Sequence, residues 1–178
     1  MKIEKIVCPV LDENCYLLII NKDVLIVDPG SGSNIIKKFI QDNNLNVLGF
    51  LITHYHYDHV GALRDLMDEY NDNVYDFKVL GCHSIKEFSF EIISTYGHTE
   101  DSVSFYFKND NIMFSGDFLF YRSIGTLEFG GNKEAMINSI KKIKLFNKDI
   151  KIFPGHGDYT FLKDEILCNP FFGDDYLW

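Results

Sequence analysis

The stretch Thr53-His54-Tyr55-His56-Tyr57-Asp58-His59-Val60-Gly61 contains three of the chain's six histidines and one aspartate within six consecutive positions. A hydrophobic core does not need such a cluster, whereas imidazole and carboxylate groups are the ligands that zinc and similar divalent ions prefer. The stretch therefore indicates a metal site.

The spacing inside this stretch favours two separate groups of ligands. Residues two apart in an extended segment face the same way, so His54 and His56 can bind one ion together. A helix is predicted to begin near Asp58, because apolar residues recur at helical spacing at Val60, Leu63, Met67 and Tyr70. The chain therefore turns near Asp58, and the turn directs Asp58 and His59 towards a second ion nearby.

Short apolar runs and turn signals predict strands that alternate with helices. Strands are expected at residues 15–20, 24–27, 47–52, 88–95, 103–107, 112–114 and 150–153. Helices are expected after Ser33, which can act as an N-cap, and over residues 133–146 and 160–167. Residues 74–87 predict a loop that contains at most a short strand. This alternation indicates an α/β layered protein with a single domain over residues 1–178.

Five of the predicted strands have a polar group just beyond their C-terminal end. These groups are Asp28, His54, His98, Asp117 and His156. Ligands of open α/β sheets gather beyond the carboxyl ends of the strands, so all five groups are expected to meet at one edge.

The number of candidate ligands predicts two metal ions. The opening stretch alone offers four, which is too many for one catalytic zinc that must keep a coordination position open. His98, Asp117 and His156 bring the total to seven. Three ligands for each ion and one shared carboxylate suit a two-metal site, in which the ions lie roughly 3.5–4 Å apart.

Composition and charge narrow the range of partners. The chain has 178 residues, of which 46% are hydrophobic and 24% charged, as expected of a soluble globular protein with a full core. The net charge of −9 argues against binding to nucleic acid or to an anionic membrane. Four scattered cysteines without a C-x-x-C pair, no apolar leader and no run of transmembrane length predict a cytoplasmic protein. The sequence does not indicate an oligomeric state.

Several short motifs follow one another in a fixed order. They are T-H-x-H-x-D-H-x-G at 53–61, G-H-T at 97–99, S-G-D at 115–117 and P-G-H-G at 154–157, together with V-D-P-G at 27–30, Leu119-Phe120, Ser123-Ile124-Gly125, Gly130-Gly131 and Asn169-Pro170-Phe171. This ordered set resembles the metallo-β-lactamase-fold hydrolases and, among them, the glyoxalase II-like (hydroxyacylglutathione hydrolase-like) branch. The resemblance covers the chain from about residue 14 to 171.

The resemblance implies a four-layer αββα sandwich with the site at one edge of the paired sheets. It also implies that one metal ion is held by His54, His56 and His98, and a second by Asp58, His59 and His156. In this family pattern Asp117 bridges the two ions and Asp28 is a nearby support. The ions are expected to be zinc, with iron or manganese as alternatives. Asp117 favours an ester or thioester hydrolase, because zinc β-lactamases usually have a cysteine at the corresponding place.

The sequence thus predicts a zinc-dependent hydrolase in which a metal-bridging hydroxide attacks a carbonyl. Asp58 and Asp117 are the expected catalytic residues, which orient the nucleophile. The expected partner is a small-molecule thioester or ester, above all a thioester of the hydroxyacylglutathione type. The alternatives are a lactone or phosphodiester hydrolase on the same site, a mononuclear iron enzyme similar to the persulfide dioxygenases, and a protein that uses the metals only for stability.

The walls around the site depart from the family pattern. The residues 125–128, Gly-Thr-Leu-Glu, stand where these relatives have G-R-x-D, so an arginine is lost. Arg122 and Tyr159 are the candidate substrate contacts, whereas Tyr55 and Tyr57 are expected to pack beside the metals.

Overall fold

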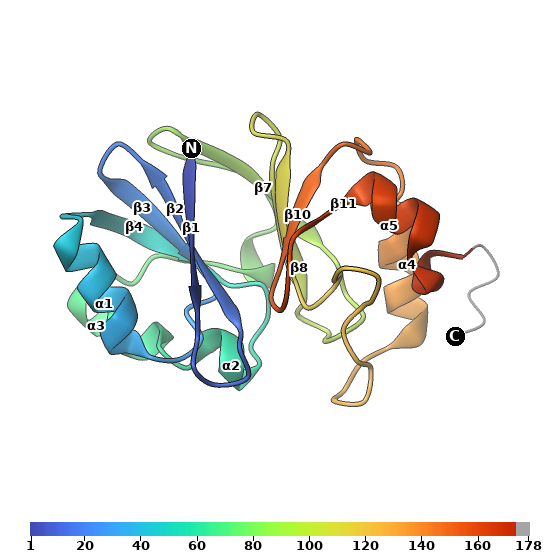
Figure 1. Ribbon diagram of the computed structural model, residues 1–178, viewed down its shortest axis with the longest axis horizontal. Coiled ribbons are helices and arrows are strands. Elements are labelled where there is room, and N and C mark those ends of the chain that lie inside the picture. Colours follow the sequence, from blue (N-terminus) through green and yellow to red (C-terminus); the bar gives the residue numbers. More distant parts are fainter. Residues whose placement is uncertain (174–178) are drawn as a thin grey trace.

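The structure, a computed structural model, describes residues 1–173; the last five residues of the predicted domain lie outside this range. Two mixed β-sheets pack face to face. Helices α1 (Ser33–Asp42) and α3 (Leu63–Glu69) cover the outer face of one sheet, and α4 (Lys133–Ile143) and α5 (Leu162–Cys168) cover the outer face of the other (Figure 1). This is the αββα sandwich that the sequence predicts.

Each sheet is built from one half of the chain. The first has the order β1-β2-β3-β4-β5, with β1 (Lys2–Val7), β2 (Asn14–Ile20), β3 (Asp23–Val27), β4 (Asn46–Leu51) and β5 (Val74–Tyr75). The second has the order β11-β10-β9-β8-β7-β6, with β6 (Gly81–Ile85), β7 (Phe88–Ser94), β8 (Val103–Phe107), β9 (Ile112–Gly116), β10 (Lys151–Pro154) and β11 (Thr160–Phe161). Strands β3, β4 and β5 are mutually parallel, as are β9 and β10; the other pairs are antiparallel.

Strand β3 shows why the layers stack in this way. Side chains alternate along a strand, so Val24 and Ile26 pack under the first pair of helices, whereas Leu25 and Val27 pack between the sheets. A third apolar cluster lies between the second sheet and helices α4 and α5. A strand that is apolar on both faces is therefore buried on both faces, which is what a four-layer sandwich needs.

Two edge regions differ from the sequence prediction. Strand β1 and strand β6 are regular strands, paired with β2 and β7, although residues 74–87 predict little more than a loop. Both strands mix exposed with partly buried residues and polar with apolar ones, so they lack the continuous apolar run that marks the buried strands. Besides β5 and β6, this region contains a 3₁₀ turn, η1 (Phe77–Val79).

Four helix boundaries also differ. The helix predicted over residues 160–167 begins only at Leu162, because Thr160 and Phe161 form β11, which pairs with β10. The helix predicted from Asp58 is interrupted: α2 (Tyr57–Val60) ends at Gly61, and the N–H of Ala62 donates to the carbonyl of Pro29 before α3 begins. Ser33 is the first helical residue of α1 rather than its cap, because Gly32 adopts the left-handed conformation at the cap position. Helix α4 ends at Ile143 rather than residue 146, and a second 3₁₀ turn, η2 (Pro170–Phe172), closes the described chain.

The functional edge lies where loops leave the carboxyl ends of β3, β4, β7, β9 and β10. In Figure 1 this is the lower edge of the sandwich, near α2. None of the helices among residues 1–173 is long and apolar enough to cross a membrane.

Candidate metal centre

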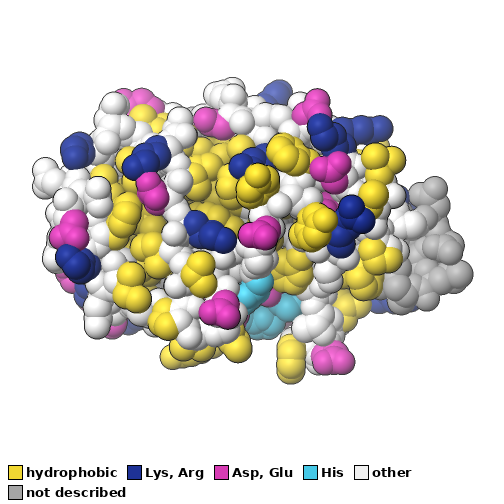
Figure 2. Space-filling view, in the orientation of Figure 1, with side chains coloured by type: hydrophobic (Ala, Val, Ile, Leu, Met, Phe, Trp, Pro, Cys, Tyr) yellow, Lys and Arg dark blue, Asp and Glu magenta, His cyan; other side chains and the backbone are white. Residues whose placement is uncertain are grey.

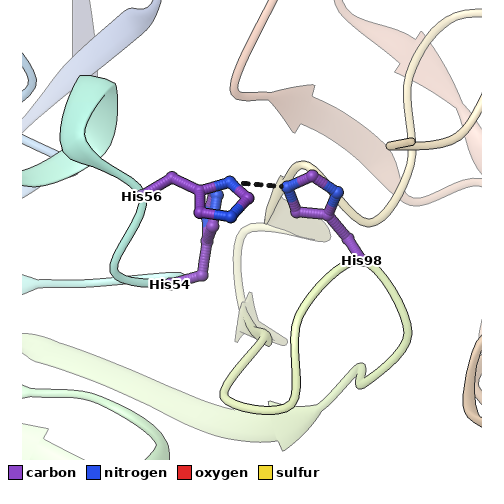
Figure 3. A group of neighbouring side chains, drawn as sticks. All are labelled: His54, His56 and His98. Atoms are coloured by element: carbon purple, nitrogen blue, oxygen red, sulfur yellow. Dashed lines mark hydrogen bonds between the residues drawn. The ribbon is translucent and has the colours of Figure 1, made fainter. Parts of the chain in front are cut away.

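The first group of candidate ligands consists of His54, His56 and His98. One ring nitrogen from each lies within 4.8 Å of the others. His54 and His56 follow β4, and His98 comes from the loop after β7 in the opposite sheet, so the group spans both halves of the chain (Figure 3). His56 Nδ1 lies 3.0 Å from His98 Nε2. Three imidazoles thus converge from two sheets.

The second group consists of Asp58, His59 and His156. Asp58 Oδ2 lies 3.2 Å from His156 Nε2 and 3.8 Å from His59 Nε2. Asp58 and His59 lie on the short helix α2, and His156 comes from the loop after β10. The three ligand atoms lie within 4.8 Å of one another.

Asp117 lies between the two groups. Its Oδ1 is 3.3 Å from His59 Nε2, and its Oδ2 is 3.7 Å from both His98 Nε2 and His156 Nε2. The structure therefore brings all seven predicted ligands together at one edge, with one carboxylate facing histidines of both groups.

Hydrogen bonds on the far side of the rings fix their orientation. The Thr53 hydroxyl donates to Asp28 Oδ2 and so accepts from His54 Nδ1 at 3.1 Å. His98 Nδ1 donates to the Thr126 carbonyl at 2.7 Å, and His59 Nδ1 lies 3.0 Å from Asp28 Oδ2. Each bond uses Nδ1 and leaves Nε2 directed at the centre, as in histidines that bind metals.

Asp28 is the support that the resemblance implies. Besides His59, it accepts hydrogen bonds from the N–H and the hydroxyl of Thr53, at 2.8 and 2.6 Å. It is buried, and it links the opening stretch to the end of β3. The Asp28 carboxylate thus fixes the position of His54, through Thr53, relative to that of His59.

The electrostatics of the buried groups suit a cation. Burial, together with nearby His59, lowers the pKa of His54 well below its usual value, so this ring is in the neutral form that binds metals. Burial also opposes charge on His59, but Asp117 and Asp28 raise its pKa to about 10. Burial likewise opposes charge on Asp117, yet His59 and the other rings lower the pKa of this carboxyl.

Buried atoms without a partner test whether a metal fits. His54 Nε2, His59 Nε2 and Asp117 Oδ1 are buried and make no hydrogen bond; the last two atoms form an ion-pair contact with each other, at 3.3 Å. Leaving such groups unpaired costs roughly 1–3 kcal/mol each, more when they are charged. All three point into the space that the two ligand groups share, and nitrogen and carboxylate donors in this ratio suit zinc or a similar ion. The residues therefore fit divalent metal ions.

Glycines allow the backbone to approach these ligands. A Cβ on Gly155 would collide with Asp117 Oδ1 and His59 Cε1. Gly116 has a φ of 50° and lies against the Thr53 side chain. The S-G-D and P-G-H-G motifs thus contain glycine where a larger residue would displace a ligand.

Glu13 is a polar group near the site that sequence reasoning missed. Its side chain is completely buried, Oε1 lies 4.0 Å from His59 Nδ1, and neither oxygen has a hydrogen-bond partner. Burial, followed by the nearby Asp28, raises the pKa of this carboxyl far above its usual range. An acidic residue immediately before the apolar run of β2 was the available signal.

Other candidates lie outside the centre. The Tyr55 hydroxyl donates to Asp76 and its ring packs on Phe77, so Tyr55 packs against η1 and does not line the opening of the centre, whereas Tyr57 does. His83 bonds to the Val79 carbonyl and stacks on Phe90, which is a structural role.

The centre opens into a hollow of about 390 Å³. It is lined by Leu11, His56, Tyr57, Asp58, His98, Asp117, Thr126 and Phe129. Arg122 and Tyr159, the candidate substrate contacts, are not among these residues. The Arg122 guanidinium lies over the Tyr121 ring, and Tyr159 borders neighbouring hollows instead.

Fold and site together define a protein with two sheets, two outer helix layers and a histidine- and aspartate-rich metal centre at one edge. The model of the metallo-beta-lactamase superfamily matches residues 8–89 and 71–156, and the chain belongs to this superfamily. A probable metallo-hydrolase, YqgX of Bacillus subtilis (strain 168), is 30% identical over 90% of this chain and 92% of its own length. The hydroxyacylglutathione hydrolase GloC of Haemophilus influenzae is 31% identical over 96% and 98%.

Solved structures agree with the assignment. The BLEG-1 B3 metallo-beta-lactamase superposes with a TM-score of 0.89 at 27% identity, covering 96% of this chain and 99% of that one. TTHA1623 in a di-iron-bound form superposes with a TM-score of 0.83, also at 27% identity, covering 94% and 99%. The fold family and the ligand groups together imply divalent metal ions at this site.

Proposed function

We propose that this protein is a binuclear metal-dependent hydrolase that cleaves the acyl carbon–sulfur bond of a small-molecule thioester of the hydroxyacylglutathione type, releasing a carboxylate and a thiol. The observation that carries the proposal is the position of Asp117, whose oxygens face His59, His98 and His156 at 3.3–3.7 Å. A carboxylate between two groups of three ligands supports a pair of ions better than a single one. The similarity to a hydroxyacylglutathione hydrolase supports the substrate class.

The seven candidate ligands would bind the two ions in two groups. His54, His56 and His98 would hold one ion, and Asp58, His59 and His156 the other, with Asp117 shared. Zinc is the proposed metal, because it favours imidazole and carboxylate ligands and tolerates low coordination numbers. When bound, two such ions make water acidic near neutral pH and polarise a carbonyl oxygen.

Asp58 and Asp117 are the proposed catalytic residues. Their carboxylates lie on the open side of the centre and line the hollow, where they can accept hydrogen bonds from an attacking water and orient it. Asp28 and Thr53 would position His54 and His59 without touching the substrate. The buried surroundings of His54 and His59 keep bulk water away from the far side of the centre.

Hydrolysis by the His54→Ala variant tests the proposal. The zinc-loaded protein and this variant are assayed against S-lactoylglutathione, with His83→Ala as a control that removes a histidine outside the centre. We expect turnover by the parent chain and the control, and none by His54→Ala, which retains its circular dichroism spectrum. Normal turnover by His54→Ala contradicts the proposal.

A further inference from the structure

Three large hydrophobic side chains stand exposed around the mouth of the hollow. Leu11, Tyr57 and Phe129 are 71%, 73% and 70% exposed, and we refer to them as the rim. They belong to three separate segments: the loop between β1 and β2, the start of α2, and the loop before α4. In Figure 2 hydrophobic side chains flank the histidines on the lower edge of the molecule. Exposed apolar groups gathered around a concave site typically mark a binding surface.

The rim loop that carries Leu11 is firmly anchored. The N–H of Cys8 donates to the Glu13 carbonyl, the N–H of Val10 to the Ser31 hydroxyl, and the N–H of Asn14 to the Gly155 carbonyl. Leu11 itself has a φ of 61°, a conformation that leucine rarely adopts. Backbone strain of this kind clusters at ligand-binding sites, where the surrounding structure enforces it. Leu11 is therefore held in the solvent beside the ligands by its loop.

The loop that carries Phe129 is tied to the centre. The Thr126 carbonyl accepts the hydrogen bond of His98, the N–H of Gly131 donates to the Leu127 carbonyl, and the N–H of Asn132 donates to the Gly97 carbonyl. The segment thus begins and ends on the residues around His98. Phe129 projects from it at a fixed place relative to the ligands.

The hollow contains no positive side chain. No lysine or arginine is among the described residues that line it, and the exposed neighbours of Leu11 and Phe129 in the sequence, Asp12 and Glu128, are acidic. The lysines gather elsewhere: Lys5 and Lys151 border a second hollow of about 360 Å³ between the edges of the two sheets, where Lys151 Nζ lies 3.6 Å from the centre of the Tyr159 ring. Anionic groups of a substrate thus find no lysine or arginine partner among the described residues that line the hollow.

We infer that the rim selects the acyl group of the substrate, and that this group is bulky, apolar and uncharged, such as an aromatic 2-hydroxyacyl group. This inference rests on the proposed function. With the carbonyl at the ligands, either the acyl or the thiol side of a thioester enters the hollow. Glutathione has two carboxylates and one ammonium group and is therefore a net anion. Three apolar walls suit none of these charges, and the acidic neighbours repel the carboxylates. The acyl group therefore occupies the hollow, and the thiol projects into solvent.

The test uses four thioesters that combine two acyl groups with two thiols. Lactoyl and mandeloyl thioesters of glutathione and of neutral N-acetylcysteamine are compared by kcat/KM with the metal-loaded protein. We expect both mandeloyl thioesters to exceed their lactoyl counterparts by at least about tenfold, in line with the discrimination that apolar pockets achieve. For a given acyl group, the two thiols should give similar values.

Rim variants separate binding in the hollow from general reactivity. Leu11→Ala and Phe129→Ala should lower kcat/KM for the mandeloyl thioesters more than for the lactoyl ones. Leu145→Ala, which removes an even more exposed leucine beyond the end of α4, is the matched control and should leave the ratio as in the parent chain. Equal or higher activity on lactoyl thioesters, or a strong preference for glutathione over N-acetylcysteamine, overturns the inference and leaves the proposed function intact.

A binding measurement covers the case in which none of the four thioesters is hydrolysed, which would refute the proposed function. Calorimetry on the metal-loaded protein compares two thioethers of N-acetylcysteamine, one with a phenacyl group and one with an acetonyl group. Tighter binding of the phenacyl compound, lost in Phe129→Ala, supports an apolar hollow. Equal binding of the two compounds contradicts it.

Discussion

The floor and the rim of the hollow are built on opposite principles. We call the seven candidate ligands the floor; His56, Asp58, His98 and Asp117 line the hollow, whereas His54, His59 and His156 do not. His54, His59 and His98 are at most 2% exposed, and their Nδ1 atoms all have partners. The rim consists of Leu11, Tyr57 and Phe129, each at least 70% exposed. The floor is positioned by strand ends and by α2, whereas the rim comes from two loops and from the first residue of α2. The residues proposed to catalyse hydrolysis are thus held by the sandwich, whereas those proposed to select the substrate lie at positions where sequence can vary more freely.

The largest effect is expected from removing the residue that joins the two groups of the floor. Asp117→Ala should lower kcat by more than the roughly 10–100-fold that partners of metal ligands typically contribute, because Asp117 faces histidines of both groups. The measurement is thioester hydrolysis together with metal content by mass spectrometry. Asp110→Ala, in the turn of the same β8–β9 hairpin, is the control. An Asp117→Ala variant with parental kcat would show that the floor does not work as one unit.

A smaller effect on metal affinity or activity is expected from changing Asp28, which supports the ligands without being one of them. Asp28→Asn should lower metal affinity or activity by roughly 10–100-fold, because the carboxylate orients His59 and Thr53. Asp23→Asn changes the residue at the other end of β3, where it pairs with Lys86 on the surface. Exposed pairs contribute only about 0–1 kcal/mol, so this control should retain its metal and its activity. Equal metal affinities of the two variants, measured by competition with a chelating dye, would argue against a support role for Asp28.

Removing the metal ions tests whether the floor, unlike the rim, depends on them for stability. The floor contains buried atoms without partners and the rim does not, so chelation should destabilise the fold around the floor. We expect a chelator to lower the melting temperature of the parent chain, and to lower that of His54→Ala by less, because this variant lacks a ligand of one of the two ions. A parent chain whose melting temperature is insensitive to chelation would indicate that the floor needs no ion.

The rim is expected to give a moderate effect on selection alone. Tyr57→Ala should lower kcat/KM for mandeloyl thioesters on the order of tenfold while metal content stays at the parental level. Loss of metal from this variant would show that Tyr57, which lies between two ligands in sequence, belongs to the floor.

The smallest effect is expected from Arg122→Ala. The sequence suggests Arg122 as a substrate contact, but its side chain lies over Tyr121 and does not line the hollow. Its kcat/KM should equal that of the parent chain for all four thioesters. A rise in KM for the glutathione thioesters alone would restore Arg122 as a contact of the thiol.

The same division explains what the sequence could predict. The floor was predictable because each ligand follows an apolar strand and sits in a compact motif, so the ends of β4, β7, β9 and β10 could be placed at one edge. The split of the opening stretch between two groups followed from the turn near Asp58. These inferences depend on local spacing and strand direction, which the sequence displays directly.

The rim, the burial of Glu13 and the break between α2 and α3 were not predictable, because each depends on contacts between segments far apart in the sequence. Leu11 and Phe129 lie in loops without periodicity, and nothing in the sequence shows that these loops meet at one hollow. The sequence does not show that Glu13 is buried, because its burial depends on how the residues before β2 pair with the His156 loop. The break between α2 and α3 comes from a contact with Pro29 more than thirty positions earlier, and helical spacing alone does not reveal it.

Metal content per chain tests the central claim most directly. The protein is loaded with zinc, freed of excess ion and analysed by mass spectrometry alongside its hydrolase activity, with His83→Ala as a control outside the centre. The proposed site predicts two ions per chain in the parent and the control, and fewer than two in Asp117→Ala. One ion per chain at full activity would contradict a binuclear centre shared through Asp117.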